Sequence, residues 1–375
     1  MQKRSQITII VCMIFLLMAC SSPSLFRAPP TFVPSNKFTQ LYESLRDETA
    51  ASLVEIVMLS ALLNSSPLLQ VGYISENNVV VGIYDNGGTV KGWNADTATV
   101  AFSHELGIVS PKALSLLPSG KIVIGATNHV FKHDIFNKNA EYVSGIAVWD
   151  VRQGNLIGCI THPCPGGNAR EDGILGLATD ADGTWLATFS ETGLGLSSID
   201  GNTPSLYYTI NPLDASYQWQ IGSVVFDERN RRYVVIFQEG RIYVSDKEYS
   251  TNYHIIEKGT KGNGITVTDS IVDPTGRWLA VGRGDTTQLL NLDDGKVSSQ
   301  FSVTNPVLAF DQTGEIFFVG SNNQLEIYSL DEVVKVSEYE TPGITSLVVS
   351  EDNRLIIWGD VYGQVHVWGI PASRP

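Results

Sequence analysis

The chain has 375 residues, of which 43% are hydrophobic and 17% charged, and its formal net charge at pH 7 is −14. Enough apolar side chains are present to bury a large core, which argues against a disordered chain. The acidic balance argues against binding of nucleic-acid phosphate or anionic lipid by bulk electrostatic attraction.

The first 19 residues have the pattern of a secretory signal. A basic start, MQKR, precedes the apolar run ITIIVCMIFLLM. That run is shorter than the roughly 20 residues a membrane-spanning helix needs. The next residues, LMAC at 17–20, resemble the bacterial lipoprotein signal. The resemblance implies cleavage before Cys20 and lipidation of that cysteine, while an ordinary signal peptide or an uncleaved anchor stays open.

Two short segments follow the signal. Residues 20–36 are rich in Ser and Pro and show no periodicity, so we expect an extended tether. In residues 37–52, Phe38, Leu41, Tyr42 and Leu45 follow helical spacing, which predicts a short helix that leads into the main domain.

A pattern of apolar run, turn cluster and second apolar run recurs along the chain, as in LATDADGTWLATF (177–189) and IVDPTGRWLAVG (271–282). Asp and Ser cap such turns and Gly or Asn accept a positive φ near their end, so each copy predicts a β-hairpin. The turn-ending residues of the copies are Asn78, Gly120, Gly183, Asn230, Gly276, Gly314 and Asn353. Their spacings of 42, 63, 47, 46, 38 and 39 residues are typical of β-propeller blades.

Most copies continue with two more strands, such as GTVKGW (88–93) and ATVAFS (98–103). The seventh copy lacks a fourth strand, and we expect LVEIVML (53–59) to supply it, because pairing the chain ends in one blade removes two exposed sheet edges. The predicted fold is therefore all-β: a seven-bladed propeller of four-stranded antiparallel blades over 53–370, followed by a tail at 371–375.

Three strand endings carry a further likeness. VWD at 148–150, KGWNADT at 91–97 and VWGI at 367–370 resemble the Trp-Asp endings of the WD-repeat family of seven-bladed propellers. The Gly-His pair that this family places before its first strand is absent from every copy, so the family's Asp-His-Ser/Thr-Trp network is not carried over. A quinoprotein-like or other seven-bladed propeller stays open.

The cysteines are consistent with export. Cys12 would leave with the signal and Cys20 would be lipidated, which leaves Cys159 and Cys164 in CITHPC. Because an extracytoplasmic compartment permits disulfides, we predict a bond between these two, with two free thiols as the alternative.

The largest irregularities of the repeat fall on one expected face of the ring. Residues 127–144 enlarge the second blade, and residues 161–172 join it to the third. Long loops on a rigid scaffold are where binding usually occurs. We therefore predict that partners contact the following residues: Phe131, His133, Phe136, Tyr142, His162, Arg170 and Trp219.

No catalytic signature is present: the chain lacks GxSxG, a P-loop and a GxGxxG in a βαβ context. His129, His133 and His162 lack the HExxH pattern, and we expect neither a metal nor a cofactor. The leading hypothesis is a monomeric, non-enzymatic propeller, lipid-anchored outside the cytoplasm, that binds protein or peptide partners at the bacterial envelope. In a cell with two membranes, Ser21 implies the outer one. The alternative is a carbohydrate-binding or hydrolytic propeller with an acidic central site.

Overall fold

The computed structural model divides the chain into two compact units, 1–34 and 35–375. The described residues all belong to the second unit and are 42–43, 45–46, 52–60, 68–84, 88–105, 113–117, 120–126, 145–160, 176–180, 182–189, 194–199, 206–208, 221–245, 253–258 and 266–371. The predicted signal (1–19), Cys20 and the predicted tether (20–36) lie outside this set. Within it, no helix has the length and apolar character needed to cross a membrane.

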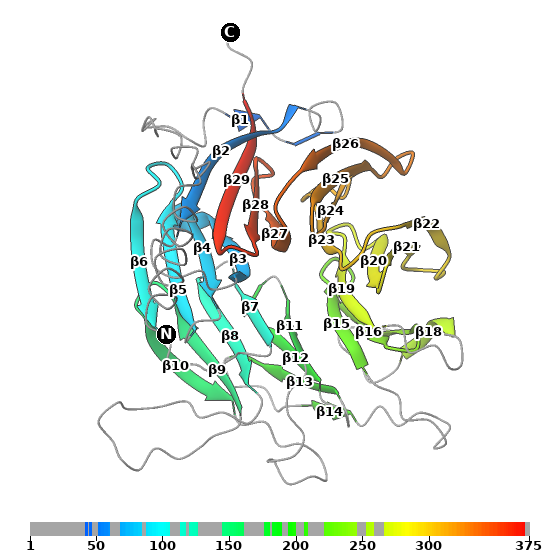
Figure 1. The fold of residues 1–375 in the computed structure, drawn as a ribbon. Helices are drawn as coiled ribbons and strands as arrows, with labels where there is room; N and C mark the ends of the chain where they lie inside the picture. The colour runs from blue at the N-terminus through cyan, green and yellow to red at the C-terminus, as the bar shows by residue number, and fades with distance from the viewer. Residues whose placement is uncertain are drawn as a thin grey trace, which may run out of the picture. The chain divides into compact units, whose positions relative to one another are not determined.

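Six sheets each contain four antiparallel strands in consecutive order (Figure 1). Their strands are β3 (Leu68–Ile74), β4 (Val79–Tyr84), β5 (Thr89–Asn94) and β6 (Val100–Glu105); β7 (Ala113–Leu116), β8 (Lys121–Ala126), β9 (Gly145–Asp150) and β10 (Asn155–Ile160); β11 (Gly176–Thr179), β12 (Trp185–Phe189), β13 (Leu194–Ser198) and β14 (Leu206–Tyr208); β15 (Ile221–Asp227), β16 (Arg232–Phe237), β17 (Arg241–Ser245) and β18 (Tyr253–Lys258); β19 (Val267–Val272), β20 (Trp278–Arg283), β21 (Thr286–Asn291) and β22 (Val297–Phe301); β23 (Val307–Phe310), β24 (Ile316–Gly320), β25 (Gln324–Ser329) and β26 (Val334–Glu340).

A further sheet has five strands and joins the two ends of the unit. Strands β27 (Ile344–Val349), β28 (Leu355–Asp360) and β29 (Gln364–Pro371) are consecutive, and both β1 (Tyr42–Glu43) and β2 (Val54–Ser60) pair antiparallel with β29. The β2 register runs from Val54 opposite Gly369 to Ser60 opposite Gln364. In Figure 1, β2 accordingly lies beside β29. This is the strand pairing that the sequence predicts for 53–59.

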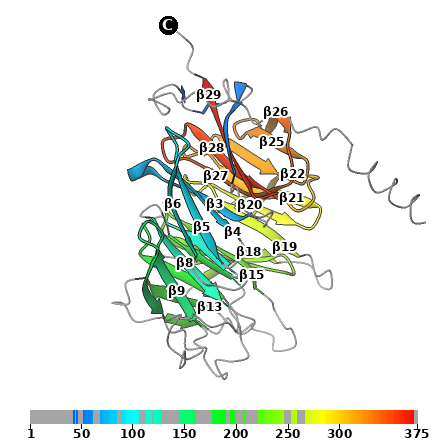
Figure 2. The same cartoon turned by 60° about the vertical axis from the view of Figure 1, so that its left-hand side comes forward.

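The first strand of each sheet lies against the first strand of the next. Such contacts join β7 to β11, β11 to β15, β15 to β19, β19 to β23, β23 to β27 and β27 to β3. Between β3 and β7 an apolar cluster containing Ile74 and Leu114 makes the connection. Figure 2 shows the same sheets from a second direction, again with β27 and β28 next to β3. The inner strands therefore surround a common centre, which is the arrangement of propeller blades.

The hairpin turns form for the reason that the sequence suggests. Asp180 Oδ1 accepts hydrogen bonds from the backbone N–H groups of Thr184 and Trp185 at 2.7 and 2.8 Å. Asp273 and Asp311 make the equivalent pair of bonds in their own hairpins. In the last hairpin Ser350 Oγ takes this role instead. These side chains bind N–H groups that would otherwise be unpaired, so they fix where each second strand begins.

Two sequence expectations require correction. The short helix predicted over 37–52 is wrong for the described residues: Tyr42 and Glu43 form strand β1, and Leu45 and Arg46 are not helical. The apolar residues of this segment contribute to the core without forming a helix, since Leu45 is buried in the apolar cluster of the neighbouring strands. The expectation of four strands in every blade also holds only for six sheets. Strand β29 continues to Pro371, inside the predicted tail, and its extra length pairs with β1.

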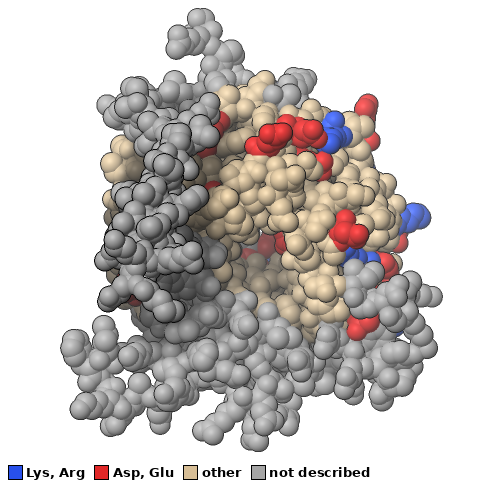
Figure 3. All heavy atoms as spheres, viewed as in Figure 1, with Lys and Arg blue, Asp and Glu red and all other residues tan. Residues whose placement is uncertain are grey.

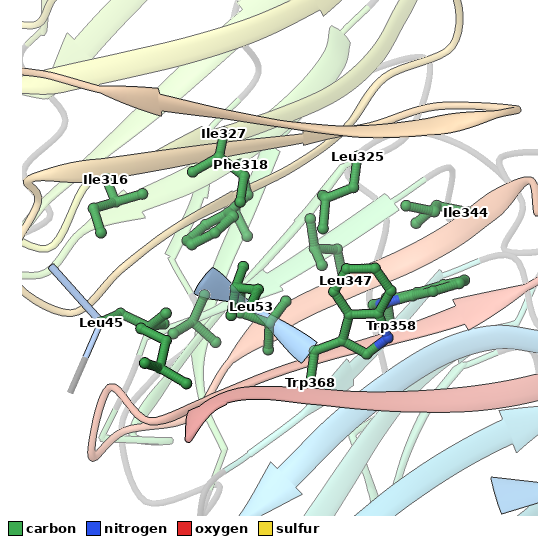
Figure 4. Packing of buried hydrophobic residues seen from close by; sticks show 14 residues of the cluster. Leu45, Leu53, Ile316, Phe318, Leu325, Ile327, Ile344, Leu347, Trp358 and Trp368 are labelled. Atoms are coloured by element: carbon green, nitrogen blue, oxygen red, sulfur yellow. The ribbon is translucent and has the colours of Figure 1, made fainter. Parts of the chain in front are cut away.

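The largest apolar cluster of the described residues lies where the segment around β1 and β2 meets the C-terminal strands (Figure 4). Leu45 and Leu53 from the N-terminal segment pack with Phe318, Trp358 and Trp368. Leu45 is 1% exposed, and its backbone N–H donates to Asn353 O at 2.7 Å. The N-terminal segment is thus part of the core of this region.

Candidate functional site

A cavity of about 400 Å³ lies at the centre of the sheets. Its walls come from five inner strands or the residue just before one: Leu69, Gln70, Ala113, Leu114, Thr268, Asp269, Pro306, Val307, Leu308, Thr345, Ser346 and Leu347. Figure 3 shows a hollow in the middle of the viewed face. These residues lie within the first four positions of their strands or just before the strand, so the cavity lies toward the end at which the inner strands begin.

The inner strands are held together around this cavity by polar bonds as well as apolar contacts. Ser346 Oγ accepts from the backbone N–H of Val71 at 3.0 Å, across the boundary between β27 and β3. Asp269 Oδ2 accepts from the backbone N–H of Leu308 at 2.8 Å, across the boundary between β19 and β23. Each bond joins a backbone N–H on the inner strand of one sheet to a side chain on the inner strand of the next, which helps to fix the spacing of adjacent sheets.

Asp269 is the charged group of the site. Its Oδ1 accepts from the backbone N–H of Ser270 at 2.7 Å, so both carboxylate oxygens have donors. Burial nevertheless raises the pKa of Asp269 to about 6, against the two backbone hydrogen bonds, which lower it. At neutral pH the carboxylate is therefore mostly ionised but poorly solvated, and it gains from any cationic or donor-rich group that enters the cavity.

The cavity also contains an unused acceptor. Gln70 Oε1 is buried and has no hydrogen-bond partner in the described structure. Gln70 lines the same cavity as Asp269, although on a different strand. Buried polar atoms without partners are uncommon and are often satisfied by water or by a ligand. The described lining is thus rich in hydrogen-bond acceptors and hydroxyls and contains no Lys or Arg.

The lining contains few of the groups that hydrolysis or metal binding would use. Asp269 is the single carboxylate among the described residues that line the cavity. No group of three or more His, Cys, Asp or Glu side chains within the described residues is arranged to hold a metal ion. A glycosidase of the usual type requires two carboxylates about 5–9.5 Å apart.

The predicted binding loops attach at the cavity end of the sheets. Inner strands begin at this end, and in each four-stranded antiparallel sheet the second strand ends there and the third begins there. The connection 127–144 joins β8 to β9, and 161–175 joins β10 to β11, so both are anchored at this end. The loops themselves lie outside the described residues. So do the predicted contact residues Phe131, His133, Phe136, Tyr142, His162, Arg170 and Trp219.

Of the two cysteines predicted to form a disulfide, one lies within the described residues. Cys159 belongs to β10 and pairs with Ala147 of β9. Cys164 lies outside the described residues, and the bond stays a prediction.

The comparisons with known proteins identify a similar fold but no family. The chain matches no family model and no curated protein sequence. Among solved structures, it is similar to the β-propeller domain of Myceliophteria thermophila Cps50 (Swd1), with a TM-score of 0.62. The match covers 83% of this chain and 99% of that one, at 16% sequence identity.

The chain has a WD-repeat-like β-propeller fold. At this identity the likeness concerns the fold alone. It agrees with the VWD ending of β9, which fits the Trp-Asp pattern, and with the degraded version VWGI in β29.

Sequence reasoning did not find Asp269. The sequence VTDSIV did contain a signal: it places a carboxylate inside an inner strand, and the other residues of that strand are apolar or small. An acidic residue at such a position is costly to bury without a structural or binding role.

Proposed function

We propose that the chain is a membrane-tethered propeller scaffold that binds protein or peptide partners at the bacterial cell envelope. The observation that carries the proposal is the acceptor-rich cavity at the end of the sheets where 127–144 and 161–175 are anchored. A rigid rim with long connections around a polar hollow suits a partner that inserts a donor-bearing side chain and contacts the loops.

The anchor rests on the sequence. The basic start, the short apolar run and LMA before Cys20 support cleavage and lipidation at that cysteine. Labelling of cells with a radioactive fatty acid tests this. We expect label in the wild type and in a Cys12→Ser control, and none in Cys20→Ser. Equal labelling of Cys20→Ser would contradict the anchor.

The binding role is tested with a deletion and two substitutions. Deleting 128–143 should remove partner capture from envelope extracts, because the deleted residues are anchored at the cavity end. Asp269→Ala should weaken capture without removing the loop. Asp331→Ala, in the turn between β25 and β26 at the opposite end, serves as the matched control and should capture normally. Capture that is unchanged in both cavity-end variants contradicts the proposal.

The ring closure is also an inference. We infer that the five-stranded sheet serves as a seventh blade, with β2 in the position of its outer strand. A chain that lacks residues 1–62 should then unfold at lower urea than a chain that lacks only 1–40. Equal midpoints would show that β2 does not complete a blade.

The bond between Cys159 and Cys164 is part of the same envelope proposal, since it requires an oxidising compartment. Alkylation of the purified protein without reductant, followed by mass measurement, decides it. Two added alkyl groups on these cysteines would rule the bond out. The hydrolytic alternative gains no support from the described lining, which provides one carboxylate.

A further inference from the structure

A buried histidine connects the N-terminal strand to the last blade. His366 lies in the middle of β29 and is 5% exposed. Its Nδ1 is 2.6 Å from Glu55 Oε1 on β2, and its Nε2 is 3.2 Å from Asp360 Oδ2 at the end of β28. The Trp358 ring stacks on the imidazole at 3.7 Å between centroids and 6° between planes, which fixes the orientation of the ring.

This geometry requires two donors from one imidazole. Ionised carboxylate oxygens only accept hydrogen bonds, and a neutral imidazole donates from one nitrogen only. With a neutral ring, one nitrogen lone pair would therefore face a carboxylate oxygen. Asp360 cannot easily turn away, because its Oδ1 accepts from the backbone N–H groups of Tyr362 and Gln364 at 2.9 and 2.8 Å. The arrangement is complete only when His366 is an imidazolium.

The charges around the ring favour that form. Burial lowers the pKa of His366, but the hydrogen bonds and charges of Asp360 and Glu55 outweigh it, and the net pKa is above the usual value of 6.5. The hydrogen bond from His366 in turn lowers the pKa of Glu55 below its usual 4.5, although burial opposes this. On β4, Tyr84 interacts with the same Asp360: its pKa is raised by burial and by the charge of that carboxylate.

We propose that Glu55, His366 and Asp360 form a proton-operated latch that holds strand β2 on the last blade. The cation spans the boundary between the N-terminal strand and the C-terminal hairpin, since Glu55 belongs to the former and the other two residues to the latter. Protonation of the imidazole holds β2 in place through Glu55. Loss of that proton removes this contact, while the backbone ladder and the apolar contacts of β2 remain.

The direction of the effect follows from linkage. The pKa of His366 is higher in the folded protein than in the unfolded chain. Its contribution to the free energy of unfolding is therefore complete below about pH 6.5 and is lost as the pH rises through the folded-state pKa. Glu55 has the opposite sign: its contribution is complete above about pH 4.5 and is lost as the pH falls through its lowered folded-state pKa. The latch is therefore closed in mildly acidic conditions and opens toward alkaline pH.

Glu55 makes the latch accessible to solvent. Its side chain is 42% exposed, whereas His366 and Asp360 are almost fully covered. Protons can thus reach the cluster from the β2 side without unfolding of the blade. Among the described strands, β2 pairs with β29 alone, so it is the strand that a weakened latch should release first.

Hydrogen–deuterium exchange on the full chain tests the latch. Protection of amides 54–60 relative to those of β28 should fall several-fold between about pH 5.5 and about pH 8.5, on either side of the histidine range. His366→Gln should remove this dependence. The matched control is His104→Gln on outer strand β6, where the ring packs on Phe102 and faces Arg152 O. It should keep the full pH dependence.

Glu55→Gln removes one anion and should move the midpoint of the transition to lower pH, a shift that a merely structural role would not produce. Should His366→Gln fail to fold, ¹⁵N spectra of the wild type decide. At about pH 6.5 both ring nitrogens of His366 should carry the shifts of an imidazolium. A neutral ring there, an unchanged midpoint in Glu55→Gln, or pH-independent protection in the wild type would overturn the proposal.

Discussion

The N-terminal segment can be tested as a structural part of the five-stranded sheet by the substitution Leu45→Ala. Leu45 is 1% exposed and packs in the apolar cluster with Phe318 and Trp368. Its carbonyl accepts from Asn353 Nδ2 at 3.2 Å, and the same amide donates to Asp311 Oδ2 at 3.1 Å. The side chain is therefore inserted between two blades and is fixed there through its own backbone.

The expected cost follows from the atoms removed. Leu→Ala deletes three buried carbon atoms, which at about 0.8 kcal/mol each gives about 2.4 kcal/mol of lost transfer free energy. A cavity term is added because the surrounding strands are tied by ladder hydrogen bonds and relax only in part, so we expect a total of about 3 kcal/mol. The backbone bonds to Asn353 do not depend on the side chain and should persist.

Urea unfolding followed by tryptophan emission measures this cost, since Trp358 and Trp368 belong to the same cluster. The midpoint should fall at an unchanged slope, which signifies lost stability and not a different unfolded state. Arg46→Ala, at the exposed neighbouring position, is the control and should change stability by less than about 1 kcal/mol. If Leu45→Ala is no more destabilising than this control, the segment does not contribute to the core.

Three further substitutions, two of them with a control variant, test individual contacts. Arg283→Met should cost about 3 kcal/mol in urea unfolding, because the 6% exposed guanidinium is paired with Glu257 across a blade boundary. Lys296→Met, whose ammonium is 82% exposed, is the control and should leave the urea midpoint nearly unchanged. Asp269→Asn should flatten the pH profile of stability between about pH 4 and pH 7: burial raises the pKa of Asp269 to about 6, so the wild type loses stability as the pH rises through this range. Asp180→Ala should cost about 2 kcal/mol by leaving two turn N–H groups unpaired, while Asp182→Ala, exposed in the same turn, should be nearly neutral in thermal unfolding.

The repeated hairpins are the part of the fold that the sequence predicts best, because turn chemistry is local. Asn78, Gly276 and Asn353, for example, have the positive φ expected of a turn-ending residue. The fourth hairpin differs: Arg231 has a φ of 50°, and the predicted Asn230 instead bonds to Asp227. Either Asn230 or Arg231 could have taken the positive-φ position that ends this turn. The apolar pattern of the flanking strands does not indicate which of the two does so.

The N-terminal segment shows where local reasoning fails. Leu45 follows helical spacing relative to Tyr42, yet Tyr42 forms a strand. The decisive interactions are with Asn353 and with β29, more than 300 positions away along the chain, and no local pattern encodes them. The predicted pairing of residues 53–59 succeeded because it was argued from the global need to remove sheet edges.

The candidate site was less accessible to sequence reasoning for a related reason. Asp269 and Gln70 share one cavity only because five separate strands converge on it, and each residue alone resembles an ordinary polar position in a strand. His366 is similar: Glu55 is 311 positions away from it. Spacing along the chain indicates neighbours within a hairpin, and it does not indicate which blades meet.

The two attachments of the N-terminal segment differ in chemistry, and this separates their responses to pH. Leu45 is held by apolar contact and backbone bonds, so the cost of Leu45→Ala should be the same at about pH 5.5 and about pH 8.5. His366→Gln removes a charge-dependent contact, so its cost should be larger at the lower pH and shrink at the higher one. Because β2 and Leu45 contact the same five-stranded sheet, a pH-dependent cost for Leu45→Ala would mean that both attachments release as one unit. Independent behaviour would mean that protons control strand β2 alone.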